Sequence, residues 1–260
     1  MQVACILSDA TDDPAMIPVT RARHGGRVWQ RFRDYGFARA RTELPLALAE
    51  IDAVAASFPI LFRATSDGPV AVIALDPANR GRVAVVGPDG CWCAPYVPAA
   101  LRAWPFDMLC GSDGIPVLSV DETSGLVSAE PPGLAFFDAD GELAAELRQV
   151  RGFLRMRMAS ERAARQAARA LADAGLLAPG ASGMLGLDDA ALRRLDPDAL
   201  DRLWRNGALR LAMAQRISLH HMGWLSQAGA PRAGPPDPDL PPGVGGFLSA
   251  LARACTEEER

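Results

Sequence analysis

Three apolar runs that lie close together constrain the fold of this chain most strongly. They cover residues 60–63, 70–75 and 82–86. The second and third are continuously apolar and are bounded by Gly, Pro and Asp, which is typical of strands buried on both faces. We therefore predict a β-rich region here. A further strand is predicted at 115–120, where Pro116 favours an edge position because proline cannot donate a ladder hydrogen bond.

The second half of the chain has a helical pattern instead. From Asp140 onward, apolar residues recur at the spacing of one helix face: Leu143, Leu147, Val150, Leu154 and Met158. We predict that Asp138 or Asp140 caps this helix, that Gly152 kinks or divides it, and that Gly175 ends it.

The same helix is rich in arginine between residues 148 and 169. We expect these side chains to form a solvated outer face paired with Glu146 and Glu161. An acidic partner could also use this face.

Further helices are predicted after a Gly and Pro linker near 179–183. Asp188 caps one, and Asp196 followed by Pro197 is a strong start signal for the next, which 206–207 should break. The predicted buried residues are Leu200, Leu203 and Trp204, followed on one seam by Met213, Ile217, His220 and Trp224.

These patterns indicate an α+β protein, with a mixed β-rich N-terminal half packed with a C-terminal helical half. We predict a β-rich domain over 1–135 and a helical region over 136–230. A Pro/Gly-rich tail follows over 231–260, with a short terminal helix predicted at its end.

The charge and composition exclude several classes of function. All 27 basic residues are arginine against 31 acidic residues, a net charge of -4, which argues against a nucleic-acid binder. The lack of lysine removes Schiff-base chemistry. No stretch reaches the ~20 apolar residues of a membrane span. The first residues lack the basic and apolar regions of a signal peptide, so we expect a cytoplasmic protein.

Five cysteines and three histidines are available as metal ligands. The cysteines are Cys5, Cys91, Cys93, Cys110 and Cys255, an odd number in which we expect reduced thiols. Cys91, Cys93, Cys110 and His24 could hold zinc, but Cys-x-Cys is not the usual knuckle spacing. Adjacent His220 and His221 would point about 100° apart on a helix. We predict no metal and no cofactor.

Two sets of residues are candidates for a functional site. His24, Glu50 and Tyr96 could form a polar centre for acid and base catalysis, although a structural hydrogen-bond network is favoured. The aromatics could line a groove for a peptide or apolar ligand, with most of them in the core: Trp29, Tyr35, Phe58, Trp92, Tyr96, Trp104 and Phe106. The predicted binding residues are Trp92, Tyr96, Trp104, Phe106, His24 and Glu50.

Several short motifs in a fixed order add a family resemblance. In the first half they are His24, 35–38, Glu50, 55–60, 90–92, 96–99, 101–102 and 104–106, and in the second half 137–142, 171–179, 205–209 and 218–219. With these motifs the chain resembles the SapC family of bacterial proteins over residues 15 to 227. Members of that family tend to be encoded near outer-membrane receptors and halogenase-like enzymes, so the resemblance implies an accessory role.

We therefore predict an accessory or binding protein that recognises a protein or peptide partner, because the aromatics are concentrated while no known catalytic set occurs. The alternative is an enzyme acting on a peptide or amino acid, with His24, Glu50 and Tyr96 as its polar centre. Association with a surface layer is a third hypothesis, disfavoured by the missing export signal.

Overall fold

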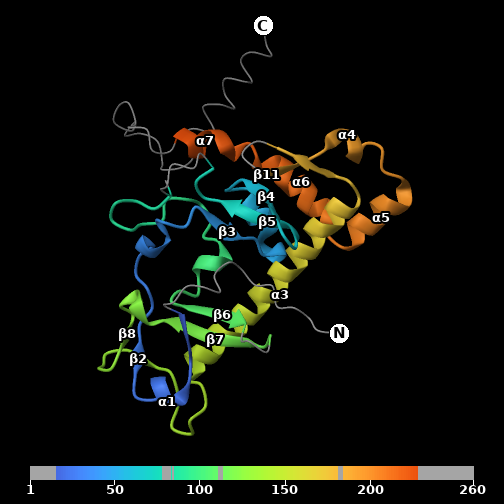
Figure 1. Ribbon diagram of the computed structural model, residues 1–260. Coiled ribbons are helices and arrows are strands. Elements are labelled where there is room, and N and C mark those ends of the chain that lie inside the picture. The colour runs from blue at the N-terminus through green and yellow to red at the C-terminus, as the bar shows by residue number, and fades with distance from the viewer. Residues whose placement is uncertain (1–15, 78–82, 84, 111–113, 181–183, 228–260) are drawn as a thin grey trace, which may run out of the picture. The chain divides into compact units, whose positions relative to one another are not determined.

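The computed structural model describes residues 16–77, 83, 85–110, 114–180 and 184–227 (Figure 1). The tail predicted over 231–260 therefore lies outside the described residues. All described residues belong to one compact unit. It combines three small antiparallel sheets with helices concentrated in the second half of the chain, so the α+β prediction is confirmed.

The largest sheet has five strands in the order β10-β11-β4-β5-β3. Its strands are β3 (Glu43–Pro45), β4 (Ile60–Thr65), β5 (Gly68–Ala74), β10 (Leu177–Pro179) and β11 (Met184–Leu187). The predicted strands at 60–63 and 70–75 are thus confirmed, and they form the β4–β5 hairpin. Because β10 and β11 come from the second half and pair with β4, residues on both sides of the predicted boundary at 135 share one sheet.

The third predicted strand, at 82–86, is wrong in its described part. Val83 and Val85 are buried, as their apolar character requires. They are not in a strand, and Val86 forms only an isolated bridge with Trp92. This segment reaches the core as a turn rather than as a strand.

A second sheet has the order β1-β7-β6, with β1 (Met16–Pro18), β7 (Pro116–Asp121) and β6 (Phe106–Cys110). The predicted edge position of β7 is wrong, since it lies in the middle. Proline is tolerated because β1 pairs only with Ser119–Asp121, which leaves β6 as the sole neighbour at Pro116. The third sheet joins β8 (Val127–Ser128), β2 (Val28–Trp29) and β9 (Leu134–Ala135).

Short helices occupy the first half and longer ones the second. The first group comprises α1 (Arg21–His24), η2 (Gly36–Ala38), η3 (Leu48–Glu50), α2 (Ile51–Ala55), η4 (Ala99–Leu101) and η5 (Glu122–Ser124). The second comprises α3 (Ala145–Asp173), α4 (Asp189–Leu192), α5 (Pro197–Arg205), α6 (Ala208–Ser218) and α7 (His221–Gln227). Residues 98–104 contain only the single helical turn η4. Among these described helices, none is long and apolar enough to cross a membrane.

Helix α3 links the two hydrophobic cores of this unit. Leu147 and Leu154 near its start pack in the core that contains β6 and β7, whereas Ala168 and Leu171 near its end pack in the core under β4 and β5. Figure 1 shows this long yellow helix running past both sheets. It is unbroken at Gly152, contrary to the predicted kink.

The ends of the helices agree only in part with the predicted capping. Helix α3 starts after Ala144, and Asp138 instead accepts a hydrogen bond from the Glu142 backbone N–H (3.0 Å) in the preceding turn. Gly175 ends the helix with φ +67°, as predicted. Asp188 and Asp196 both accept hydrogen bonds from the first turns of α4 and α5.

The predicted buried faces of α5 and α6 are largely wrong. Leu203 is buried, but Leu200 is 43% and Trp204 is 70% exposed. On α6, Ile217 is 61% exposed, whereas Met213 is partly buried against the core, as predicted. The buried residues of α6 are Leu211 and five small or polar ones: Ala208, Ala212, Ala214, Gln215 and Ser218. His220 is exposed, and the side chain of Trp224 is outside the described part. Small side chains therefore make up much of the buried face of α6, together with Leu211.

Candidate functional site

Five partly exposed aromatic side chains form a continuous series of ring contacts, which we call the aromatic ladder: Phe32, Tyr35, Phe37, Trp92 and Trp104. Phe37 stacks on Trp104 with ring centroids 4.8 Å apart and an interplanar angle of 6°. Phe32 contacts both Tyr35 and Phe37, at 5.3 and 5.2 Å. Tyr35 continues the series to Trp92 at 5.2 Å. The ladder thus connects segments that are about 60 residues apart in sequence.

Backbone hydrogen bonds hold the ladder in place. The Tyr35 N–H donates to the Gly90 carbonyl (2.8 Å), and the Trp92 indole N–H donates to the Tyr96 carbonyl (2.8 Å). Gly90 has φ +84°, and a Cβ there would meet the Asp34 side chain at 2.7 Å. Only glycine therefore allows the two segments to approach so closely.

Two arginines lie over aromatic rings at this surface. The guanidinium carbon of Arg41 is 5.1 Å from the ring centroid of Trp104, and that of Arg102 is 4.9 Å from Tyr96. Arg102 also donates to the Val97 carbonyl at 2.9 Å. Arginine and aromatic residues are the side chains most enriched where proteins bind other proteins. The composition of this surface is therefore that of a recognition site.

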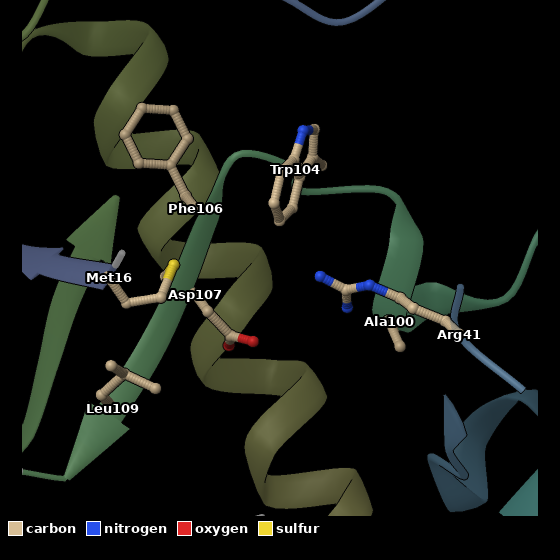
Figure 2. A pocket seen from close by; sticks show the side chains of 7 residues that line it. All are labelled: Met16, Arg41, Ala100, Trp104, Phe106, Asp107 and Leu109. Carbon is tan, nitrogen blue, oxygen red and sulfur yellow. The ribbon is translucent and has the colours of Figure 1, made fainter. Parts of the chain in front are cut away.

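A pocket opens at the Trp104 end of the ladder. Its volume is about 440 Å³, part of which is open to solvent. It is lined by Met16, Arg41, Ala100, Trp104, Phe106, Asp107 and Leu109. Figure 2 shows the Arg41 guanidinium and the Asp107 carboxylate pointing into the same space beside the Trp104 ring. The pocket therefore combines an apolar wall with one group of each charge.

A buried ion-pair cluster lies behind the pocket. Arg157 of α3 pairs with Asp107 through one guanidinium nitrogen, and its Nε lies 3.0 Å from Glu161 Oε1. Both Arg157 and Glu161 are nearly inaccessible to water. Burial raises the pKa of Glu161, and the nearby charge of Asp107 raises it further, against the opposing effect of Arg157.

Glu50 and Tyr96 come together as predicted. The Tyr96 hydroxyl donates to Glu50 Oε2 (2.9 Å), which also accepts from the Ala99 N–H (2.7 Å). The second oxygen of Glu50 accepts from the Ala47 N–H at 3.4 Å. Burial, followed by the hydrogen bond to Glu50, raises the pKa of Tyr96 to about 12. The phenol therefore stays protonated and acts as a donor that anchors the 96–99 segment.

His24 does not join this pair. It is buried at the end of α1, where its Nε2 lies 3.1 Å from Glu122 and its ring contacts Phe136 at 4.9 Å. Within the described part of the chain, it makes no hydrogen bond or ion pair with Glu50 or Tyr96. The three-residue polar centre suggested by the sequence is therefore not formed.

The other predicted aromatics divide between the core and the surface. Trp29, Phe58 and Phe106 are buried, although Phe106 also lines the pocket. Trp92, Tyr96 and Trp104 are half-buried at the surface. Sequence reasoning missed four contributors: Phe32, Phe37, Arg41 and Asp107. The close spacing of Phe32, Tyr35 and Phe37 was the available signal for the first two.

The cysteines give no metal centre in the described residues. No group of three or more His, Cys, Asp or Glu side chains there could hold a metal ion. Cys91 and Cys93 are exposed free thiols, and a hydrogen bond from Cys91 to Asp89 raises the pKa of Cys91. Cys110 is disulfide-bonded, so the reduced thiol predicted for it is wrong.

Comparison with known proteins gives one match. The SapC family matches residues 19–225, which include the whole ladder, Glu50, Tyr96 and helix α3. Searches of curated proteins and of solved structures found no match. The family match covers most of the chain and agrees with the motifs identified in the sequence. The chain therefore belongs to the SapC family.

Proposed function

We propose that this protein is an accessory or binding protein that recognises a protein or peptide partner through the aromatic ladder and the adjoining pocket. The observation that carries the proposal is the continuity of five half-exposed aromatic rings beside Arg41 and Arg102. Rings that are held rigidly and only partly covered offer a large contact area at little cost in conformational entropy.

Arg41 and Asp107 at the mouth of the pocket support a peptide as the ligand. A peptide presents apolar side chains together with carbonyl and N–H groups along its backbone. The apolar wall of the pocket suits the former, and the guanidinium and carboxylate suit the latter. A purely apolar ligand would remove water from both charged groups without offering them a hydrogen bond.

The hydrogen bonding of Glu50 favours this proposal over an enzyme. Both carboxylate oxygens of Glu50 accept bonds from Ala47, Tyr96 and Ala99. A general base needs an oxygen that can reach a substrate proton. These contacts are those of a structural acceptor, and His24 is engaged with Glu122 instead.

Selection from a random peptide library displayed on phage tests the proposal. We expect the full-length protein to enrich one consensus motif. The F37A and W104A variants should bind the selected peptides at least about tenfold more weakly than the wild type, because each deletes a ring of the ladder. W204A is the matched control, because Trp204 is 70% exposed and not part of the ladder.

Melting temperatures of all variants would show whether they remain folded. R41Q provides a second probe that removes the charge over Trp104 without opening the ladder. The proposal would be overturned if no motif were enriched. It would also be overturned if F37A, W104A and R41Q all bound the selected peptides as tightly as the wild type does.

The proposed location is the cytoplasm. The two exposed free thiols, Cys91 and Cys93, favour a reducing compartment, whereas the disulfide of Cys110 favours an oxidising one. Fractionation of the native host decides: recovery outside the cytoplasm would contradict this part of the proposal.

A further inference from the structure

The outer face of α3 carries four arginines at intervals of seven residues, which we call the arginine row: Arg148, Arg155, Arg162 and Arg169. All four are exposed. Seven residues are nearly two full turns, so these side chains lie along one side of the helix. At about 1.5 Å per residue, successive arginines are about 10.5 Å apart and the row is roughly 31 Å long.

Most of the row is not neutralised by the residues that the structure describes. Arg148 pairs with Asp138 at 3.3 Å. No carboxylate of the described part forms an ion pair with Arg155, Arg162 or Arg169. Glu161 does pair with an arginine of the 148–169 stretch, as predicted, but that arginine is Arg157. The pair is buried and not part of the predicted solvated face. The row is therefore a concentration of positive charge on a protein whose net charge is -4.

The electrostatics of Arg165 are consistent with this concentration. This arginine lies half-buried beside the row. Burial lowers the pKa of Arg165, and the positive charges of Arg169 and Arg162 lower it further, against the opposing effect of Glu161. Neighbouring arginines therefore repel one another here, and an incoming anionic group would relieve that repulsion.

One side of the row carries several small side chains. The residues that follow the first three arginines of the row by one or four positions lie on this side. Three of them are small, namely Gly152, Ala159 and Ala163, and the others are Gln149, Met156 and Gln166. Met156 is 68% exposed, an unusual position for a large apolar side chain. Small side chains let a second backbone come close, and an exposed methionine adapts to different contact surfaces.

We propose that the arginine row docks an acidic helix of a protein partner, with Glu or Asp repeating every seven residues. Two helices that pack side by side keep such rows in register, and charges flanking the contact select the partner. A nucleic acid is disfavoured as the occupant because the remaining surface of a protein of net charge -4 would repel its phosphates. The row shares no residue with the aromatic ladder, so the two proposals are independent.

The probe is a synthetic helical peptide of about four heptads with Glu at every seventh position, compared with an isomer whose Glu residues are distributed around the helix. The test variant of the full chain is R155Q/R162Q/R169Q. The control is R193Q/R194Q/R202Q, which changes three exposed arginines elsewhere. Each set leaves 24 basic against 31 acidic residues, a net charge of -7, so the two differ only in where the charge is lost.

Fluorescence anisotropy at low salt would measure peptide binding. We expect the wild type and the control to bind the heptad peptide at least about tenfold more tightly than the isomer, and the test variant to lose at least about tenfold in affinity. Binding should weaken as salt is added, because the row is exposed. Circular dichroism would check that each variant is folded.

Three outcomes would overturn the proposal. In the first, the test variant and the control bind equally well. In the second, the two peptides bind equally well, so that the spacing does not matter. In the third, double-stranded DNA or phosphatidylserine vesicles bind through the row and the heptad peptide does not.

Discussion

Two clusters of glutamate and arginine in this protein are built from similar groups, but the pKa of the glutamate is lowered in one and raised in the other. Glu122 lies 2.7 Å from Arg23 and 3.1 Å from Arg27 at the edge of the structure. Glu161 lies 3.0 Å from Arg157, which it shares with Asp107, inside the structure. The hydrogen bond from Arg23 is the largest cause that lowers the pKa of Glu122, to about 2. Burial raises the pKa of Glu161.

The difference shows that an arginine neighbour does not by itself decide the charge of a glutamate. Glu122 has two arginines to itself and keeps some contact with water. Glu161 shares one buried arginine with a second carboxylate and has lost its water. Removing a carboxylate from water is costly, and the attraction of Arg165 and of Arg157, which Asp107 shares, does not offset that cost. Experiments that remove one partner from each cluster test this explanation.

The largest effect is expected from R157M. The substitution keeps most of the buried volume but removes the arginine that Glu161 and Asp107 share, which leaves Arg165 as the nearby positive charge on Glu161. Breaking a buried ion pair by removing one partner typically costs about 3–5 kcal/mol. Urea denaturation at neutral pH would measure this as a fall in the free energy of unfolding.

Two controls give the R157M result its meaning. R205Q removes an exposed pair with Asp201 and should leave stability nearly unchanged. The double variant R157M/E161L should recover much of the loss, because it also removes the unpaired carboxylate. A loss for R157M below about 1 kcal/mol would mean that the inner cluster behaves like a surface ion pair.

A smaller effect is expected from E122Q. The variant loses its ion pairs with Arg23 and Arg27, which should cost about 1 kcal/mol at neutral pH because the site remains partly hydrated. The folded pKa of about 2 lies below the ordinary value of 4.5, so the contribution is present at neutral pH. It is lost as the pH falls from 4.5 toward 2.

Urea denaturation of E122Q and the wild type over that pH range would show whether the two stabilities converge. R205Q again serves as the control, since its stability relative to the wild type should not depend on pH in this way. A difference that stays constant down to about pH 2 would contradict a lowered pKa at Glu122.

The sequence was a good guide to the fold where local patterns decide the structure. The apolar runs that became β4 and β5, and the caps at Asp188 and Asp196, depend on neighbouring residues and were predicted. The faces of α5 and α6 that are buried were not predicted correctly. Trp204 is exposed while Ala208 and Ala212 are buried, because close helix packing there needs small side chains and only the tertiary structure reveals that need.

The candidate site shows the same division. Glu50 and Tyr96 come together, as the sequence predicts. The prediction adds His24 to them on residue type alone, whereas His24 lies next to Glu122. The sequence pattern places Arg157 among the solvated arginines of α3, whereas the structure buries it. Its position three residues after Leu154 on the buried face was the signal that separates it from the arginine row. Asp107 gave no local signal, since its role depends on β6 lying beside α3.

The smallest effect, and the sharpest comparison, is expected from E161Q. Glutamine has nearly the same shape as glutamate and keeps its side-chain oxygen near the Arg157 Nε, so stability at neutral pH should change by less than about 1 kcal/mol. The folded pKa of Glu161 lies above its ordinary value, so the folded wild type holds this proton more tightly than the unfolded chain does. The wild type therefore loses stability relative to E161Q as the pH rises through 4.5 and past the folded pKa. This is the reverse of E122Q, against which the wild type gains as the pH rises. Urea denaturation between about pH 3 and pH 7 would measure both slopes, and slopes of the same sign would show that burial does not separate the two clusters.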